Sequence, residues 1–159
     1  MRRKETTKMM NNKGFSLVEL IIVIAIMAIL IGVLAPQFMK YVERSRKSTD
    51  VQNVASIVTA LQVYATDPMV ASGDRLADGA EITLTDAVGG VAVSATNATG
   101  NAHLALQASG INTLQLRSSN WPGTATAGTV ILEVDITNGD ITVTSDVTGE
   151  DILTGVYDD

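Results

Sequence analysis

Glu19 is a single carboxylate set in a run of apolar residues. From Phe15 to Ala35, only Ser16, Glu19 and Gly32 interrupt the apolar sequence. An ionised side chain near the centre of a bilayer costs roughly 2.5 to 3.5 kcal/mol on insertion scales, so such an acid is a hypothesis of function in itself. The chemistry that it offers is electrostatic pairing with a cation of matching burial.

The apolar run around Glu19 has the length of a membrane span. As a helix that rises about 1.5 Å per residue, it extends about 30 Å, the thickness of the hydrocarbon core. A secretory signal peptide shares the basic start and the apolar run, but it ends in a small-residue cleavage site. No A-x-A triplet follows here, and Pro36 comes directly after Ala35. We therefore predict a retained transmembrane or assembly helix over residues 15–36.

Charge is distributed unevenly along the chain. Residues 1–14 hold five basic side chains and one acid, a net charge of +4, although the whole 159-residue chain carries −6. The rest of the chain therefore carries −10. A basic segment beside an apolar run stays on the cytoplasmic side of a membrane, and an acidic body repels nucleic-acid phosphates. We expect a basic leader peptide over 1–14 and exclude nucleic acid as a partner.

A second helical segment follows the apolar run. Apolar residues recur there at steps of three and four, in a stripe made of Phe38, Val42, Val51, Val54, Ile57, Val58, Leu61 and Ala65. The pattern ends at Asp67-Pro68, because the residue before a proline is disfavoured in a helix. We predict an amphipathic helix over residues 37–67.

Two features mark the junction of the two helical segments. Pro36 lacks the amide hydrogen that would bond the carbonyl of Gly32, so the helix is expected to kink or loosen between them. The charged residues that follow are predicted to form a solvated face at the membrane edge: Lys40, Glu43, Arg44, Arg46, Lys47 and Asp50.

The remaining residues, 68–159, are predicted to form an extracytoplasmic α/β head. Residues 69–103 indicate a long, partly structured connection with β-like runs at Ile82–Thr85 and Val91–Ser94, and residues 114–118 a short strand. The clearest signal is a hairpin over 129–147 with a turn at Asn138-Gly139. Its register pairs apolar residues: Ile136 with Ile141, Val134 with Val143, and Val130 with Val147. The fold class is therefore α+β, a long N-terminal helix packed on a small antiparallel sheet.

The head offers few residues for catalysis or metal binding. The chain has no cysteine, which removes disulfides and thiolate sites, and His103 is its only histidine. Asn97-Ala98-Thr99 fits a glycosylation acceptor but is short enough to occur by chance, and Trp121 is expected only to anchor a turn. The last acids could hold Ca²⁺ but lack the spacing of a loop site and are more simply a solvated tail: Glu150, Asp151, Asp158 and Asp159. We predict no enzyme activity, no cofactor and no metal.

The N-terminal residues carry a resemblance to a known family. "KGFSLVEL", followed by an unbroken apolar stretch and "AP", resembles the signature of type IV prepilins and pseudopilins: a basic leader ending in glycine, then Phe, then Glu as the fifth residue after the cut. The resemblance is specific over residues 13–38 and extends through the helix to about residue 66. In its lack of cysteine and its rather long leader, the chain resembles Gram-positive pilins more than the disulfide-looped Gram-negative ones.

The resemblance implies a processing and assembly pathway. Prepilin peptidase would cut between Gly14 and Phe15 and methylate the new amino terminus. The subunit would then pass from a single-pass precursor in the cytoplasmic membrane to a helical filament of identical copies, with help from the pilus assembly machinery. Glu19, Gly32 and Pro36 are the expected assembly residues. The family fold is similar to the one that periodicity predicts.

Cleavage also suggests a partner for Glu19. The new amino group of Phe15 would be a cation in the dry centre of a filament, and Glu19 on a neighbouring helix is an anion of matching burial. An unpaired buried charge opposes assembly by several kcal/mol, whereas a pair is tolerated and fixes register. The alternative is an incidental acid that reaches the membrane surface.

Three functions remain open at this point. The chain is a structural subunit of a surface pilus, a pseudopilin of a type II secretion or DNA-uptake system, or a single-span membrane protein with an extracytoplasmic binding domain. A mature protein that begins at methylated Phe15 would exclude the third, and the abundance and length of filaments separate the first two.

Overall fold

The computed structural model of the protein describes residues 14–122, 124, 126–138 and 140–155. Within these residues, it contains one long helix, α1 (Leu17–Thr66), a short helix, α2 (Ala102–Ala108), and five strands. The chain divides into two compact units, residues 1–40 and residues 41–159, so that α1 belongs to both. Residues 1–13 of the predicted leader lie outside the described residues.

The part of α1 in the first unit is exposed on every side. Its large apolar side chains from Leu17 to Leu34 are 50–73% exposed. By length and composition α1 can cross a membrane. Water disfavours so much exposed apolar surface, so this part of α1 requires lipid or other protein chains around it. The helix assignment continues through Gly32 and Pro36 without a break.

In the second unit, one face of α1 enters a hydrophobic core. Val54, Ile57 and Leu61 of the predicted stripe are buried, and its other members between residues 51 and 65 are half-buried. The helix ends at Thr66, so the predicted stop at Asp67-Pro68 is confirmed. Phe38 was wrongly included in the stripe, since it is 68% exposed and the buried residues of α1 begin only at Lys47.

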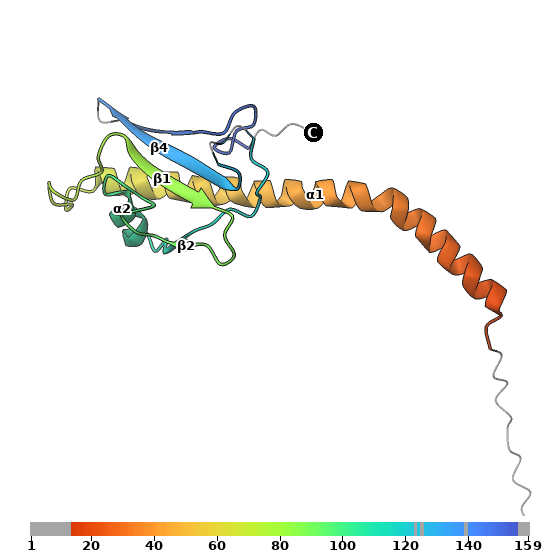
Figure 1. The fold of residues 1–159 in the computed structure, drawn as a ribbon. Coiled ribbons are helices and arrows are strands. Elements are labelled where there is room, and N and C mark those ends of the chain that lie inside the picture. The colour runs from red at the N-terminus through yellow and green to blue at the C-terminus, as the bar shows by residue number, and fades with distance from the viewer. Residues whose placement is uncertain (1–13, 123, 125, 139, 156–159) are drawn as a thin grey trace, which may run out of the picture. The chain divides into compact units, whose positions relative to one another are not determined.

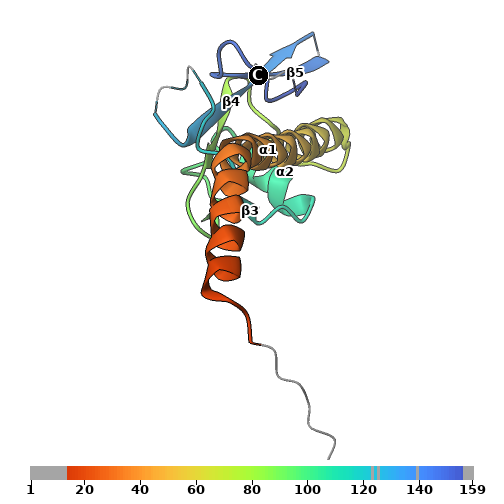
Figure 2. The ribbon, with the colours of Figure 1, turned by 90° about the vertical axis from the view of Figure 1, so that its right-hand side faces the viewer.

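Three strands form an antiparallel sheet in the order β1-β4-β5: β1 spans Ala80–Thr85, β4 spans Thr129–Thr137 and β5 spans Asp140–Ser145. Two short strands, β2 (Val91–Ala92) and β3 (Thr113–Leu114), pair separately. From here on we call the second unit, residues 41–159, the head. Figures 1 and 2 show β1 and β4 alongside the part of α1 that belongs to the head, with α2 and β5 toward opposite edges of the head. The predicted α+β fold, with a long N-terminal helix and a small antiparallel sheet, is confirmed.

The β4–β5 hairpin has the predicted register over most of its length. Asn138 adopts a positive φ of 56° at the turn, and two predicted pairs form, Ile136 with Ile141 and Val134 with Val143. The predicted pair of Val130 with Val147 is wrong, because β5 ends at Ser145. There the Asp146 carboxylate accepts a hydrogen bond from the Ile131 N–H (2.8 Å), in the place of a strand carbonyl.

The segment between α1 and β4 is more ordered than its composition predicts. The two β-like runs at 82–85 and 91–94 correspond to β1 and β2, but α2 was not predicted. The strand predicted over 114–118 is confined to Leu114 at the end of β3. Beyond Leu114, the Leu116 N–H still donates to the Thr85 carbonyl at the end of β1 (2.7 Å). The N–H groups of Arg117 and Ser118 donate instead to the side chain of Asp50 (2.6 and 2.9 Å).

Asp50 corrects the prediction of a solvated charged face on α1. Its side chain is fully buried, and Lys47, one turn earlier, is 9% exposed. The Asp50 carboxylate accepts three hydrogen bonds, from the N–H groups of Arg117 and Ser118 and from the Trp121 indole Nε1–H (3.1 Å). Trp121 therefore does more than anchor a turn, since it fastens the 117–121 loop to α1.

Three further charged side chains, Lys47, Glu150 and Glu43, complete this cluster. The Lys47 ammonium pairs with the Glu150 carboxylate and lies 5.2 Å from the centre of the Trp121 ring. The Ser118 hydroxyl donates to the Glu43 carboxylate. The prediction that Glu150 belongs to a solvated tail is wrong, because its side chain is only 9% exposed. We call Glu43, Lys47, Asp50, Trp121 and Glu150 the anchoring cluster.

We predict that Asp50→Ala lowers the free energy of unfolding by roughly 3 kcal/mol or more, because three buried donors lose their acceptor. Asp140→Ala, which removes an exposed carboxylate, is the matched control and should change stability by less than about 0.5 kcal/mol. Unfolding of the detergent-solubilised full chain, followed by fluorescence of its single tryptophan, measures both. Equal effects of the two substitutions would contradict an anchoring role.

The same carboxylate predicts a pH dependence. Burial raises the pKa of Asp50 above its usual value, against the lowering effect of its three hydrogen bonds. The folded state therefore keeps this proton to a higher pH than the unfolded chain does, so the stability contributed by protonation is present at acidic pH and is lost as the pH rises through the folded pKa. The wild type should gain stability relative to Asp50→Asn as the pH falls toward the usual aspartate pKa of about 3.9. A stability difference that is flat with pH would rule this out.

Candidate functional site

The N-terminal end of α1 brings together the predicted cleavage site and Glu19. Gly14, Phe15 and Ser16 precede the first helical residue, Leu17. Ser16 thus occupies the N-cap position, and Glu19 is the third residue of the helix. The Ser16 N–H donates a hydrogen bond to Oε2 of Glu19 at 2.8 Å. This contact is the carboxylate half of a capping box, in which a Glu at the third position satisfies the N–H of the cap residue.

The cap holds the carboxylate of Glu19 toward the N-terminal side of its own helix. The free N–H groups and aligned peptide dipoles at this end favour a negative charge there. The contact uses one carboxylate oxygen, Oε2, and reaches the residue directly after Phe15. The Glu19 carboxylate therefore binds the backbone one residue after Phe15, whose nitrogen would become the amino terminus if the chain were cut before it. The S-x-x-E spacing in the sequence was the signal for this cap, and our sequence analysis missed it.

The predicted cut lies in accessible, non-helical backbone. Phe15 is 90% exposed, and no heavy atom lies within 4 Å of the position that a Cβ on Gly14 would take. Nothing in the described chain therefore requires glycine at position 14 for packing. A small residue at this position can therefore serve only a molecule that acts on this bond.

Gly32 and Pro36 are not brought near Glu19. Both lie within α1, and Gly32 is 13 residues further along, or about 20 Å at the helical rise. A Cβ at Gly32 would also meet nothing within 4 Å, so its small size is not needed within the chain. Pro36 has no N–H to donate to the Gly32 carbonyl, which leaves that carbonyl free for another partner. Their assignment to assembly stays a prediction.

The other candidate residues do not form a catalytic or metal-binding site in the part of the chain that the structure describes. The Asn97 side chain donates to the Ala92 carbonyl (2.8 Å) and accepts from the Ser94 N–H (2.9 Å), so it holds a turn. The Thr154 hydroxyl bonds Asp151 at 2.5 Å and lowers its pKa. His103 is half-buried. Within the described residues, no group of three metal-ligating side chains comes together; Asp158 and Asp159 lie outside them.

Comparison with known proteins places the N-terminal site in a family. Residues 9–35 match the model of the prokaryotic N-terminal methylation motif. The chain is 33% identical to the fimbrial protein EcpC of Eikenella corrodens over 118 residues, which is 73% of this chain and 77% of that protein. No solved structure matches it.

Two other relatives match a smaller part of the chain. The type IV major pilin protein PilA of Myxococcus xanthus is 40% identical over 53 residues, 33% of this chain and 24% of PilA. A type IV major fimbrial protein FimA of Dichelobacter nodosus is 35% identical over 74 residues, 42% of this chain and 47% of FimA. The matched region thus spans about a quarter and about half of these two relatives. Taken with the methylation motif and the match to most of EcpC, the likeness shows that the chain belongs to the type IV pilin family.

Proposed function

We propose that the chain is the precursor of a structural subunit of a type IV pilus. Prepilin peptidase cuts it between Gly14 and Phe15 and methylates the new terminus, and α1 then carries the subunit from the cytoplasmic membrane into a surface filament. The observation that carries this proposal is the apolar half of α1, whose large side chains from Leu17 to Leu34 are all at least half exposed. A helix of this kind needs a new apolar environment when it leaves the lipid.

Identical helices can supply that environment to one another. Each fully buried aliphatic side chain contributes roughly 1.5 to 3 kcal/mol relative to its exposure to water, and packing among helices in a filament keeps that gain after the lipid is lost. Apolar packing alone does not set a register, because leucine, isoleucine and valine surfaces fit one another at many offsets. A charge pair sets the register, because any other offset between the two helices leaves both ions unpaired.

Glu19 and the amino group of Phe15 are the proposed pair. In the precursor, the Glu19 carboxylate is occupied by the Ser16 N–H. After the cut, the cation appears one residue from that contact, and in the filament it is met by Glu19 of a neighbouring copy. The capping contact keeps the carboxylate at the N-terminal end of its helix until then.

A pseudopilin of a secretion or DNA-uptake system would use the same cut and the same pair. The relatives named as major pilin and major fimbrial proteins support the pilus subunit. The length and number of fibres on cells decide between them, because a pilus subunit forms long, abundant fibres.

The processing step predicts the effect of a larger residue at the cut. Gly14→Val is expected to leave the precursor uncut in the membrane, because a branched side chain obstructs access to the backbone at a position where the chain itself leaves space. Mass spectrometry of the membrane fraction distinguishes the precursor from a chain that begins at methylated Phe15. Gly73→Val is the control, since a Cβ there also meets nothing within 4 Å. Normal processing of Gly14→Val would contradict the proposal.

Assembly predicts a different defect for Glu19→Val. Insertion should be at least as good, by roughly 3 kcal/mol, because an acid is replaced by an aliphatic residue, and cleavage should persist because the bond lies five residues away. Fibres should be lost, since an unpaired amino group costs several kcal/mol at each interface. The expected result is processed monomer in the membrane and no fibres by electron microscopy. A normal yield of fibres from cells without wild-type subunit would show that Glu19 is dispensable.

Pro36→Ala tests the free carbonyl of Gly32. The substitution restores a backbone donor, so α1 should become stiffer at this point while the membrane pool and the processing remain normal. We expect a change in the flexibility or yield of the fibres. Fibres indistinguishable from wild type in persistence length would remove Pro36 from the assembly residues.

A further inference from the structure

The basic residues of the head are confined to a few positions. Beyond residue 39, lysine and arginine occur only within residues 40–47 of α1, at Arg75 and at Arg117. Arg46 and Arg117 line an open hollow of about 470 Å³, whose other lining residues are Ser45, Thr49, Asp86 and Ser119. We call it the arginine hollow. Two guanidinium groups among hydroxyl groups suit a carboxylate, which accepts paired hydrogen bonds from arginine.

The two arginines differ in their partners within the chain. Arg46 lies 3.7 Å from the Glu43 carboxylate, one turn away on α1. Arg117 makes no ion pair with any residue that the structure describes, and Asp86 is not within ion-pair distance of either arginine in that part of the chain. The guanidinium of Arg117 is exposed and remains open to a carboxylate from another molecule.

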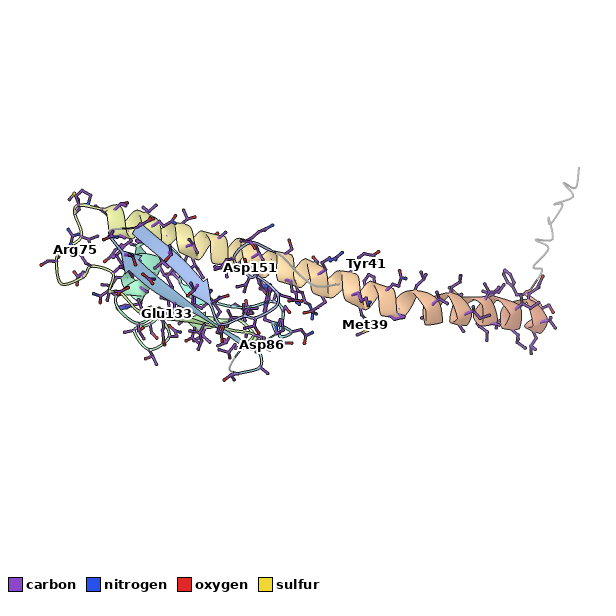
Figure 3. The ribbon with its side chains drawn as sticks, turned by 90° about the horizontal axis from the view of Figure 1, so that it is seen from above. Met39, Tyr41, Arg75, Asp86, Glu133 and Asp151 are labelled. Carbon is purple, nitrogen blue, oxygen red and sulfur yellow. The ribbon has the colours of Figure 1, made fainter. Side chains whose placement is uncertain are left out.

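The sheet presents the opposite charge. Strands β1, β4 and β5 contain no lysine or arginine, and their four acids are all exposed: Glu81, Glu133, Asp135 and Asp140. Glu81 and Glu133 are direct cross-strand neighbours. Like charges at such positions repel and destabilise the sheet. Figure 3 labels Glu133 and also Asp86, which lines the arginine hollow together with Ser45, Arg46 and Thr49 of α1.

We propose that the arginine hollow of one copy of this chain binds the Glu81–Glu133 pair on the sheet of a second copy. The inference rests on the proposed function, because a filament holds copies side by side. The guanidinium of Arg117 would remove the repulsion between the two glutamates and gain two acceptors. The exposed position of both patches makes the contact weak by itself and sensitive to salt, so its effect depends on repetition along the fibre.

A contact between the arginine hollow and the Glu81–Glu133 pair also allows a filament to extend. The arginine hollow and the Glu81–Glu133 pair have no residue in common, so a copy that uses one of them at one contact keeps the other for a second contact. When copies use the two patches head to tail, the contact is heterologous, and it extends into an open fibre if its rotation does not close a ring. This is the type of contact that a filament needs between heads.

Charge reversal tests the pairing in fibres of the full chain. Arg117→Glu and Glu133→Arg should each lower the salt concentration at which sheared fibres dissociate, because each places like charges together. The double variant restores opposite charges at the contact and should move that concentration back toward the wild type. Arg75→Glu, an exposed basic residue outside the hollow, is the matched control and should leave it unchanged. A double variant no more stable than either single variant would overturn the pairing.

Cross-linking provides a second test that does not depend on charge. The chain has no cysteine, so Arg117→Cys with Glu133→Cys introduces the only thiols. Oxidation of intact fibres should give a ladder of covalent multimers from the double variant and none from either single variant. A double variant without a ladder, or dimers from a single variant, would overturn the contact. The absence of fibres from the wild-type chain would instead contradict the proposed function.

Discussion

The apolar half of α1 has no partner within its own chain, and this constraint governs the rest of the protein. Its large side chains from Leu17 to Leu34 are at least half exposed, in a helix that continues to Thr66. The hydrophobic effect makes such a surface stable only in lipid or among other apolar chains. This part of the chain therefore requires a membrane or an assembly around it, whereas the second compact unit, residues 41–159, has a hydrophobic core of its own.

The head uses the second half of α1 as part of its core. Val54, Ile57 and Leu61 contribute apolar packing. The Asp50 carboxylate fixes how the 117–121 loop lies on α1, because its three hydrogen bonds require the donors in one arrangement. Two segments far apart in the sequence, residues 117–121 and Glu150, are held to the same turns of the helix by the anchoring cluster. Removal of one member leaves buried charges or donors without partners, which makes the cluster cooperative.

At the N-terminal end of α1, Glu19 is proposed to have two partners in succession. One carboxylate first caps its own helix through the Ser16 N–H and, in the proposed filament, then meets a cation on another copy. An acid in a span is costly, but at the N-terminal end of a helix the unpaired N–H groups reduce that cost. The position of Glu19, in the first turn rather than in the middle of the span, is what permits both roles.

The sequence by itself determined the features that depend on neighbours along the chain. The span, the helix stop at Asp67-Pro68, the hairpin register and the signature at Gly14, Phe15 and Glu19 all follow from local spacing, since helix and strand periods are local properties. The capping contact of Glu19 could have been predicted in the same way from its S-x-x-E spacing.

Only the tertiary structure decided which charges are buried. Lys47 and Asp50 have the composition and spacing of a solvated helix face, and nothing local distinguishes them from Arg44 or Arg46. Their partners, Trp121 and Glu150, lie 71 and 103 residues away. The free energy of a buried charge depends on donors that the fold brings to it from such distances, and no local pattern in the sequence records them.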